Sequence, residues 1–263
     1  MLLVLLAIVT EFAVVPAHAG GKKRLLVVTV TKGFRHDTIP TAERVIGDLA
    51  DQGRFTVDYA RTDEDLAQKM SAEGLKAYDG VAFASTTGDL PLSSPQAFLD
   101  WVRAGHGFIG IHSASDTFHG FAPYLEMLGG EFEEHTETGV AIHIADRKFP
   151  GLKDLPSPLD VPREEIYQLK NFEADQVHLL LYLDQHPGSH NPGLVPLAWC
   201  RGYGKGRVFY TALGHREDVW AASWFQEHLL GGIEWALKLS KGDDKPRPLP
   251  VIPGMATAFH AHP

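Results

Sequence analysis

Three histidines of this sequence come shortly after apolar runs that are typical of buried strands: His36, His112 and His215. An imidazole titrates at about pH 6.5, so it can take up and release protons at neutral pH, and its neutral form is a common metal ligand. Parallel strands of an open α/β sheet end at one edge, and ligands bind outside that edge. If the three strands are parallel, the sequence predicts that these side chains meet in one crevice.

Two interpretations of this histidine cluster are open. In the first, His112, His135 and His215 bind a divalent metal ion that polarises a carbonyl or hydroxyl group, with Asp116 or Glu133 as a further ligand. In the second, the histidines act without a metal as general acid and base. Their spacings match no recognisable zinc motif, so the cofactor is left unknown.

In the acid and base interpretation, His112 and His215 carry out the proton transfer. His36 supports them, and Asp116 orients them. Other chemistry fits the sequence poorly. The Gly-x-Ser-x-Gly pattern of serine hydrolases is absent, and Cys200 lies within a strand pattern typical of a buried, inert thiol. No nucleotide cofactor is expected, because neither a Walker motif nor Gly-x-Gly-x-x-Gly follows the first strand.

Residues that flank the predicted crevice are candidates for substrate binding. Aromatic faces suit the C–H surfaces of sugars, although each aromatic residue taken alone is as typical of a protein core. Backbone amides after the third predicted strand are expected to form part of the wall. The candidates are Phe34, Phe118, Tyr167, Thr86, Thr87, Gly88 and Glu217.

The elements that must position these residues alternate between strand and helix in the first part of the chain. Apolar, β-branched runs predict strands, and apolar residues at helical spacing predict helices between them. The predicted strands are 25–30, 55–60, 78–84 and 108–111, and the predicted helices are 40–50, 63–70 and 94–104. This alternation predicts an α/β fold with a doubly wound, mostly parallel sheet.

The alternation of strands and helices ends after the turn that carries His112, here called the elbow. Short strands separated by turns predict a small β-rich insertion, with His135 in a loop. The predicted short strands are 129–132, 139–145, 165–169 and 177–183. Residues 194–200 and 207–212 resemble a hairpin, and a closing amphipathic helix is expected over 224–239.

Length and charge limit the function classes. The 263 residues suit one domain, predicted over 24–240, and the Pro-rich, charged residues 241–263 predict a flexible tail. A net charge of −9 argues against nucleic-acid partners. Residues 1–19 are interpreted as a secretory signal, because an apolar run precedes a small-x-small cleavage pattern. We therefore expect a periplasmic or secreted protein without stable membrane insertion after cleavage.

Four motifs, in this order, resemble the ThuA-like family, which is named for trehalose utilisation. They are GFRHD at 33–37, GFIGIHSASD at 107–116, LGGEFEEH at 128–135 and GKGRVFYTALGH at 204–215. The resemblance covers residues 25–239. It implies a flavodoxin-like fold similar to class I glutamine amidotransferases, which carry a cysteine at the elbow and a late His-x-Glu pair. Here His112 replaces that cysteine, and His215 and Glu217 fit the late pair.

The resemblance also implies a function. Without a thiol at the elbow, amide transfer through a thioester is not expected. The family implies sugar metabolism instead, with a small carbohydrate as substrate and oxidoreductases that make 3-keto-glycosides as partners in the same pathway. The expected activity on a sugar or keto-sugar is isomerisation, or elimination followed by hydration. The alternative is a carbohydrate-binding module without turnover.

Overall fold

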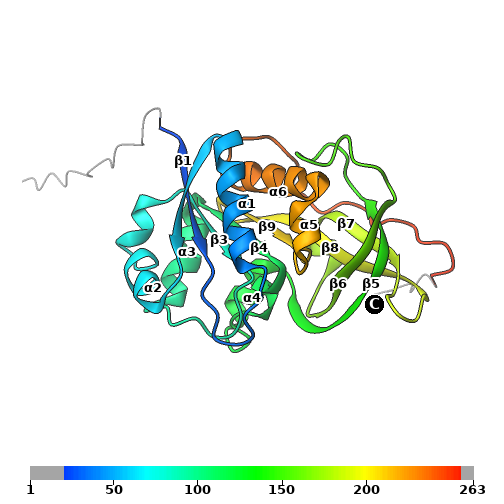
Figure 1. The fold of residues 1–263 in the computed structure, drawn as a ribbon, viewed down its shortest axis with the longest axis horizontal. Helices are drawn as coiled ribbons and strands as arrows, with labels where there is room; N and C mark the ends of the chain where they lie inside the picture. The colour runs from blue at the N-terminus through cyan, green and yellow to red at the C-terminus, as the bar shows by residue number, and fades with distance from the viewer. Residues whose placement is uncertain (1–20, 256–263) are drawn as a thin grey trace, which may run out of the picture.

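In the computed structural model, which describes residues 21–255, nine strands form one mixed sheet (Figure 1). The predicted α/β class is thereby confirmed, but the sheet is mixed rather than mostly parallel, because four strand pairings are parallel and four antiparallel. The flavodoxin-like, doubly wound arrangement stays a prediction. The predicted signal at 1–19 and the last residues of the predicted tail lie outside the described part. Within 21–255, no helix has the length and apolarity needed to cross a membrane.

One half of the sheet is parallel. Its strands are β1 (Lys23–Val28), β2 (Phe55–Ala60), β3 (Gly80–Ala84), β4 (Gly107–Ile111) and β9 (Gly206–Thr211), in the order β2-β1-β3-β4-β9. All residues of β3 and β4 are buried, which explains why they are apolar without alternation: both of their faces are covered. The carboxyl ends of β1, β4 and β9 lie at the same edge.

Helices cover both faces of this parallel half. The first face carries α1 (Ile39–Gln52), α5 (Glu217–Ala221) and α6 (Ser223–Ala236). The second carries α2 (Asp63–Lys69), α3 (Pro95–Gly105) and α4 (Ala122–Leu128). Three short 3-10 helices complete this list: η1 (Gly74–Ala77), η2 (His112–Asp116) and η3 (Ala174–Gln176). Alternate residues of β1 enter the two cores, Leu25 and Val27 in one, Leu26 and Val28 in the other.

The other half of the sheet is antiparallel and larger than the predicted insertion. Its strands are β5 (Glu131–Ile144), β6 (Leu159–Lys170), β7 (His178–Gln185) and β8 (Pro192–Tyr203). The strands predicted at 129–132 and 139–145 are one strand, β5, so the loop predicted around His135 is wrong. Most side chains of β5 are at least partly exposed and many are polar, so the apolar alternation that would mark a strand is missing.

The chain after α6 contacts the antiparallel half. His178 Nδ1 donates to the Lys245 carbonyl oxygen (2.7 Å), and Arg247 pairs with the buried Asp146 (3.2 Å). Ile252 is buried as well. The described part of the predicted tail therefore packs against the domain.

A buried histidine in α6 should make the fold less stable at acidic pH. His228 lies between Phe209 and Phe225 with neither ring nitrogen hydrogen-bonded, and burial lowers the pKa of His228 to about 3. The unfolded chain binds the proton near pH 6.5, so folding loses stability as the pH falls below that value. Between pH 7 and pH 5, the free energy of unfolding should fall by about 2 kcal/mol because of this one ring. In urea unfolding, His228→Met should remove that part of the pH dependence.

The matched control is His143→Met, because His143 is partly exposed and paired with Asp184. This variant should keep the wild-type difference between pH 7 and 5. An unchanged pH dependence in His228→Met would contradict the assignment of acid sensitivity to this ring.

Candidate functional site

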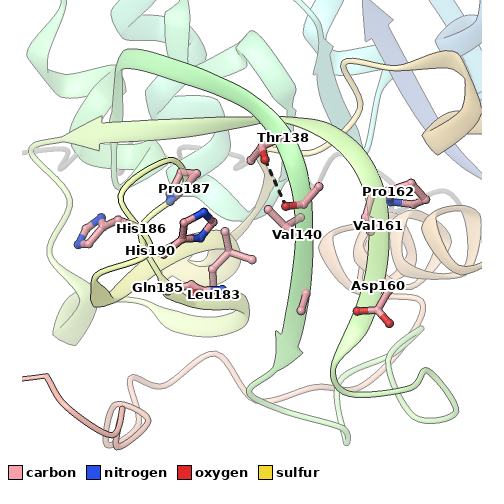
Figure 2. A pocket seen from close by; sticks show the side chains of 12 residues that line it. Thr138, Val140, Asp160, Val161, Pro162, Leu183, Gln185, His186, Pro187 and His190 are labelled. Atoms are coloured by element: carbon pink, nitrogen blue, oxygen red, sulfur yellow. Dashed lines mark hydrogen bonds between the residues drawn. The ribbon is translucent and has the colours of Figure 1, made fainter.

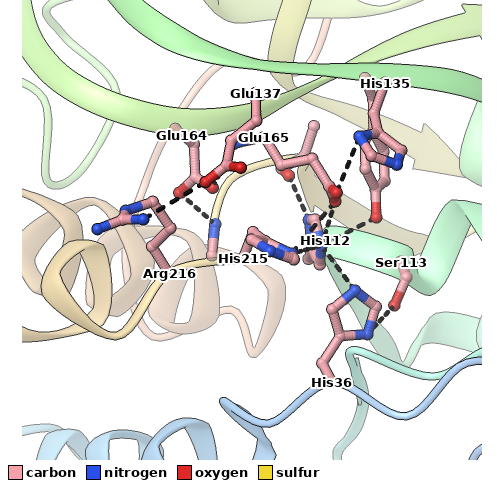
Figure 3. Close-up of polar contacts among 12 residues, drawn as sticks. His36, His112, Ser113, His135, Glu137, Glu164, Glu165, His215 and Arg216 are labelled. Carbon is pink, nitrogen blue, oxygen red and sulfur yellow. Dashed lines mark hydrogen bonds and ion pairs between the residues drawn. The ribbon is translucent and has the colours of Figure 1, made fainter.

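The structure brings the three histidines of the parallel strands together (Figure 3). His112 Nε2 lies 3.0 Å from His36 Nε2 and 3.4 Å from His215 Nδ1. Each residue follows a different strand, β1, β4 or β9, and the convergence follows from the shared edge of these strands. The geometry predicted from the strand ends is observed, while the catalytic roles stay predictions.

The elbow holds His112 in an unusual backbone conformation. Its φ of 54° is in the left-handed region, which costs a residue with a Cβ about 1–2 kcal/mol. Two hydrogen bonds fix the conformation: His112 Nδ1 donates to the Ala212 carbonyl oxygen (2.8 Å), and the Tyr210 hydroxyl donates to the His112 carbonyl oxygen (2.8 Å). With Nδ1 used in this way, only Nε2 faces the site.

A glutamate that was not among the predicted site residues completes the cluster. Glu165 of β6 places Oε2 3.2 Å from His112 Nε2 and 3.2 Å from His215 Nδ1. Burial raises the pKa of Glu165, but the contacts with His112 and His215 outweigh it and hold that pKa well below its usual range. The sequence signal was the pair Glu164-Glu165 inside a strand pattern, since glutamate is seldom buried without a partner.

The neighbouring Glu164 helps to place the loop before His215. Its Oε2 accepts a hydrogen bond from the Gly214 amide (3.2 Å), and burial raises the pKa of Glu164. Gly214 has a φ of 113°, a conformation that residues with a Cβ rarely adopt. The β6 strand therefore positions His215 through the backbone as well as through Glu165.

Two residues of the β5–β6 pair contact the cluster from above. His135 Nδ1 lies 2.9 Å from Glu165 Oε1, and the hydroxyl of Tyr167, its cross-strand partner, lies 2.9 Å from His112 Nε2. Tyr167 is buried, and burial raises the pKa of Tyr167 well above its ordinary value. Its phenol therefore keeps its proton at neutral pH.

Four side chains of this cluster could hold a metal ion. His36, His112, His215 and Glu165 each offer one ligand atom, and these atoms all lie within 4.8 Å of one another. The predicted ligand set contained His135 and lacked His36 and Glu165. In the structure, His135 instead contacts the second carboxylate oxygen of Glu165. Binding of a metal itself stays a prediction.

Burial and charge divide the roles of the histidines. Burial and the neighbouring His112 and His215 lower the pKa of His36 to about 3, so its imidazole is neutral at pH 7. The hydrogen bond to Glu165 raises the pKa of His215 above its ordinary value. The cluster therefore combines a neutral imidazole, a more basic one and an ionised carboxylate, which suits both ligation and proton transfer.

Several predicted residues support the site from behind. Asp116 Oδ1 pairs with His119 Nε2 (2.6 Å), and Asp116 is not among the four residues that could hold a metal ion. Thr86 and Thr87 are fully buried, and their hydroxyls bond to Thr117 and to the Phe34 carbonyl oxygen.

Two further predicted substrate contacts also point inward. The Gly88 amide, expected to face a ligand, donates to the Asp116 carbonyl oxygen (2.8 Å). Phe118 is buried against Phe83 and Tyr124, so it belongs to the core. A strand-end position in the sequence does not distinguish such supporting residues from ones that touch a ligand.

The rim of the site keeps two of the predicted substrate residues accessible. Phe34 is 67% exposed, and its ring meets the ring of His36 edge-on at 5.0 Å. A hollow of about 500 Å³ lies beside the cluster. It is lined by Thr38, His215, Arg216, Glu217 and Asp218.

Another hollow lies in the antiparallel half (Figure 2). It measures about 320 Å³ and is walled mainly by apolar side chains such as Val140, Val161 and Leu183, with His186 and His190 at one side. None of the predicted site residues lines it. The chemistry therefore concentrates at the carboxyl edge of the parallel strands.

Comparison with known proteins gives a family match. A family model described as ThuA, trehalose utilisation, matches residues 24–236. No curated protein matches the chain. A solved ThuA-like protein from Bacteroides uniformis superimposes with a TM-score of 0.65 at 19% identity, over 86% of this chain and 95% of that chain.

Two other solved structures share the fold. A ThuA-like protein from Parabacteroides merdae gives a TM-score of 0.65 at 20% identity, over 85% of this chain and 94% of that chain. A β-galactosidase from Rahnella sp. R3 gives 0.51 at 15% identity, over 84% of this chain but 32% of that chain. At these identities the similarities show the fold alone.

Proposed function

This chain belongs to the ThuA family, which suggests a role in trehalose utilisation, and we propose that it is an enzyme that removes a proton next to the carbonyl of a keto-sugar. One observation carries this proposal: two histidines, His36 and His215, and Glu165 converge on His112 Nε2 beside an open hollow. Such a cluster can polarise a carbonyl oxygen and move a proton in the same place.

The proposed first step is common to two reactions. A base takes the proton from the carbon next to the keto group, the C–H electron pair forms a C=C bond, and the π electron pair of the carbonyl moves onto its oxygen to give an enediolate. In isomerisation, a proton returns to the other carbon of the enediolate, while the old keto oxygen takes up the proton that the neighbouring hydroxyl gives up on becoming the new keto group. In elimination, the electron pair expels the glycosidic oxygen, which takes up a proton, and water then adds to the product.

The rim of the site supports a carbohydrate as substrate. The exposed ring of Phe34 offers an apolar surface for sugar C–H groups beside His36. Glu217 and Arg216 line the adjacent hollow and offer hydrogen-bond partners for hydroxyl groups.

Glutamine amide transfer is not part of this function. His112 stands at the elbow where that chemistry needs a thiolate, and Cys200 is buried within β8 with its thiol bonded to the Asp243 carbonyl oxygen. We take the parallel half to be a flavodoxin-like, doubly wound sheet of the amidotransferase class, which is supported by helices on both faces.

The cellular setting is part of the same proposal. We infer export to the periplasm or the medium from the signal-like residues 1–19, and a pathway partner that oxidises glycosides to 3-keto-glycosides. A keto group next to acidic C–H positions is the substrate that such an oxidoreductase would supply.

Incubation of the purified full-length protein with a panel of 3-keto-glucosides tests the function. We expect that the protein consumes at least one keto-sugar and none of the unoxidised glucosides. NMR measures the consumption. Saturable binding of keto-sugars without consumption would overturn the enzymatic proposal in favour of a binding module.

A further inference from the structure

Four polar atoms crowd around a single nitrogen in this site (Figure 3). His112 Nε2 has the Tyr167 hydroxyl at 2.9 Å, His36 Nε2 at 3.0 Å, Glu165 Oε2 at 3.2 Å and His215 Nδ1 at 3.4 Å. Nearly all of this arrangement is buried: His112 has no exposed surface, and His36 is 6% exposed.

Hydrogen bonding to His112 explains at most one or two of these contacts. An imidazole nitrogen has one in-plane position, which holds either a lone pair or a proton. Since Nδ1 donates to the Ala212 carbonyl oxygen, neutral His112 leaves a lone pair on Nε2, which opposes the Glu165 carboxylate. Protonated His112 could satisfy Glu165, but the same N–H could not also serve His36.

We propose that His36, His112, His215 and Glu165 together bind one divalent transition-metal ion. A central cation accounts for every ligand contact at once, because each ligand atom then directs its lone pair at the ion rather than at a neighbour. In a tetrahedral site with metal–nitrogen bonds of about 2.0–2.1 Å, ligand atoms are roughly 3.3–3.4 Å apart. The 3.0–3.4 Å separations from His112 Nε2 to the three other ligand atoms are close to that value.

The surroundings hold the ligands in the required states. The Ala212 carbonyl oxygen fixes the tautomer of His112, and His135 binds the second oxygen of Glu165. Such contacts behind the ligands are typical of metal sites. A ligand nitrogen must also be free of a proton, and the hydrogen bond from Nδ1 to the Ala212 carbonyl oxygen leaves the Nε2 lone pair of His112 free for an ion.

The donor set selects the class of ion. Three imidazole nitrogens and one carboxylate oxygen suit zinc, cobalt, nickel or manganese, whereas magnesium and calcium prefer oxygen ligands throughout. The ion's catalytic role rests on the proposed function: it would polarise the keto oxygen and make the adjacent C–H more acidic. Its binding does not depend on that function.

Cobalt titration of the chelator-treated, tag-free full-length protein tests the site. We expect one Co²⁺ per chain, seen as visible absorption typical of nitrogen and oxygen ligands, and its displacement by Zn²⁺ but not by Mg²⁺. A hundredfold excess of Zn²⁺ over its Kd should raise the melting temperature by roughly 5 °C or more.

Two ligand variants and a control locate the ion. Glu165→Gln and His36→Gln should each weaken Co²⁺ binding at least about a hundredfold, more than the tenfold to hundredfold typical of residues behind the ligands. His143→Gln removes another histidine paired with a carboxylate, that of Asp184, and should bind Co²⁺ as the wild type does. Circular dichroism checks that all variants fold.

Absence of stoichiometric Co²⁺ binding, or binding that folded Glu165→Gln and His36→Gln retain, would overturn the metal site. Keto-sugar assays separate the two proposals. Turnover by a protein that binds no metal would support the proposed function and overturn the metal site. Metal binding without turnover of any keto-sugar would support the metal site and overturn the proposed function.

Discussion

Replacing His112 with asparagine is expected to lower turnover of a 3-keto-glucoside by about a thousandfold or more. His112 Nε2 is the atom on which His36, His215 and Glu165 converge, and the shorter asparagine side chain cannot reach that point. Asparagine tolerates the left-handed backbone conformation found at this position, so the elbow should keep its shape. The measurement is steady-state turnover followed by NMR.

His143→Asn is the control, because His143 pairs with Asp184 in the antiparallel half. It should retain wild-type turnover. The His112→Asn protein should still bind the sugar, since the exposed Phe34 and the hollow beside His215 are unchanged. More than a tenth of the wild-type turnover in a folded His112→Asn protein would refute a central role for this imidazole.

The second large effect is expected from Tyr167→Phe, which should lower kcat by about a hundredfold with little change in KM. Tyr167 directs its buried hydroxyl into the centre of the cluster, 2.9 Å from His112 Nε2. A phenol that keeps its proton at neutral pH can donate a hydrogen bond to the oxygen that gains charge, and removal of one such donor costs about 10²–10³ in rate.

Tyr182→Phe is the matched control, since Tyr182 is a partly exposed tyrosine on β7 that stacks on His143. The phenylalanine at position 167 keeps the ring contact with Phe132, so stability should change little. An increase in KM with an unchanged kcat would show instead that the hydroxyl only helps substrate to bind.

The parallel half of the fold and three members of the site were predictable from the sequence. The strands β3 and β4 and the last four residues of β1 are apolar without alternation, because both of their faces are covered. Parallel strands end at a common edge, so His36, His112 and His215 could be placed together before their side chains were seen. The elbow motif added the backbone turn that aims His112.

The antiparallel half was harder to predict, and with it the fourth member of the site. The β5 strand is long but largely polar, and bulges interrupt its pairing with β6, so it gave no alternating pattern. Glu165 reaches the cluster only through this strand pairing, which joins residues far from β4 in the sequence. A buried carboxylate is visible in a sequence only when its partners are already known.

The proposed substrate wall shows a third limit of sequence patterns. Thr86, Thr87 and Phe118 follow strands or the elbow just as the histidines do, yet they are buried and bond or pack within the protein. Position along a strand predicts the edge of the sheet on which a residue lies. Whether its side chain faces solvent depends on loops that pack over it, such as the one bearing Phe34.

The central claim, that the cluster removes a proton next to a sugar carbonyl, is tested most directly by hydrogen exchange in D₂O. A 3-keto-glucoside is incubated with the wild-type protein, and NMR follows the protons on the two carbons beside the keto group. We predict that the protein speeds exchange at one of these carbons by at least about a hundredfold over the buffer rate, and that His112→Asn abolishes this acceleration. Exchange at the buffer rate across the keto-sugar panel would contradict the account.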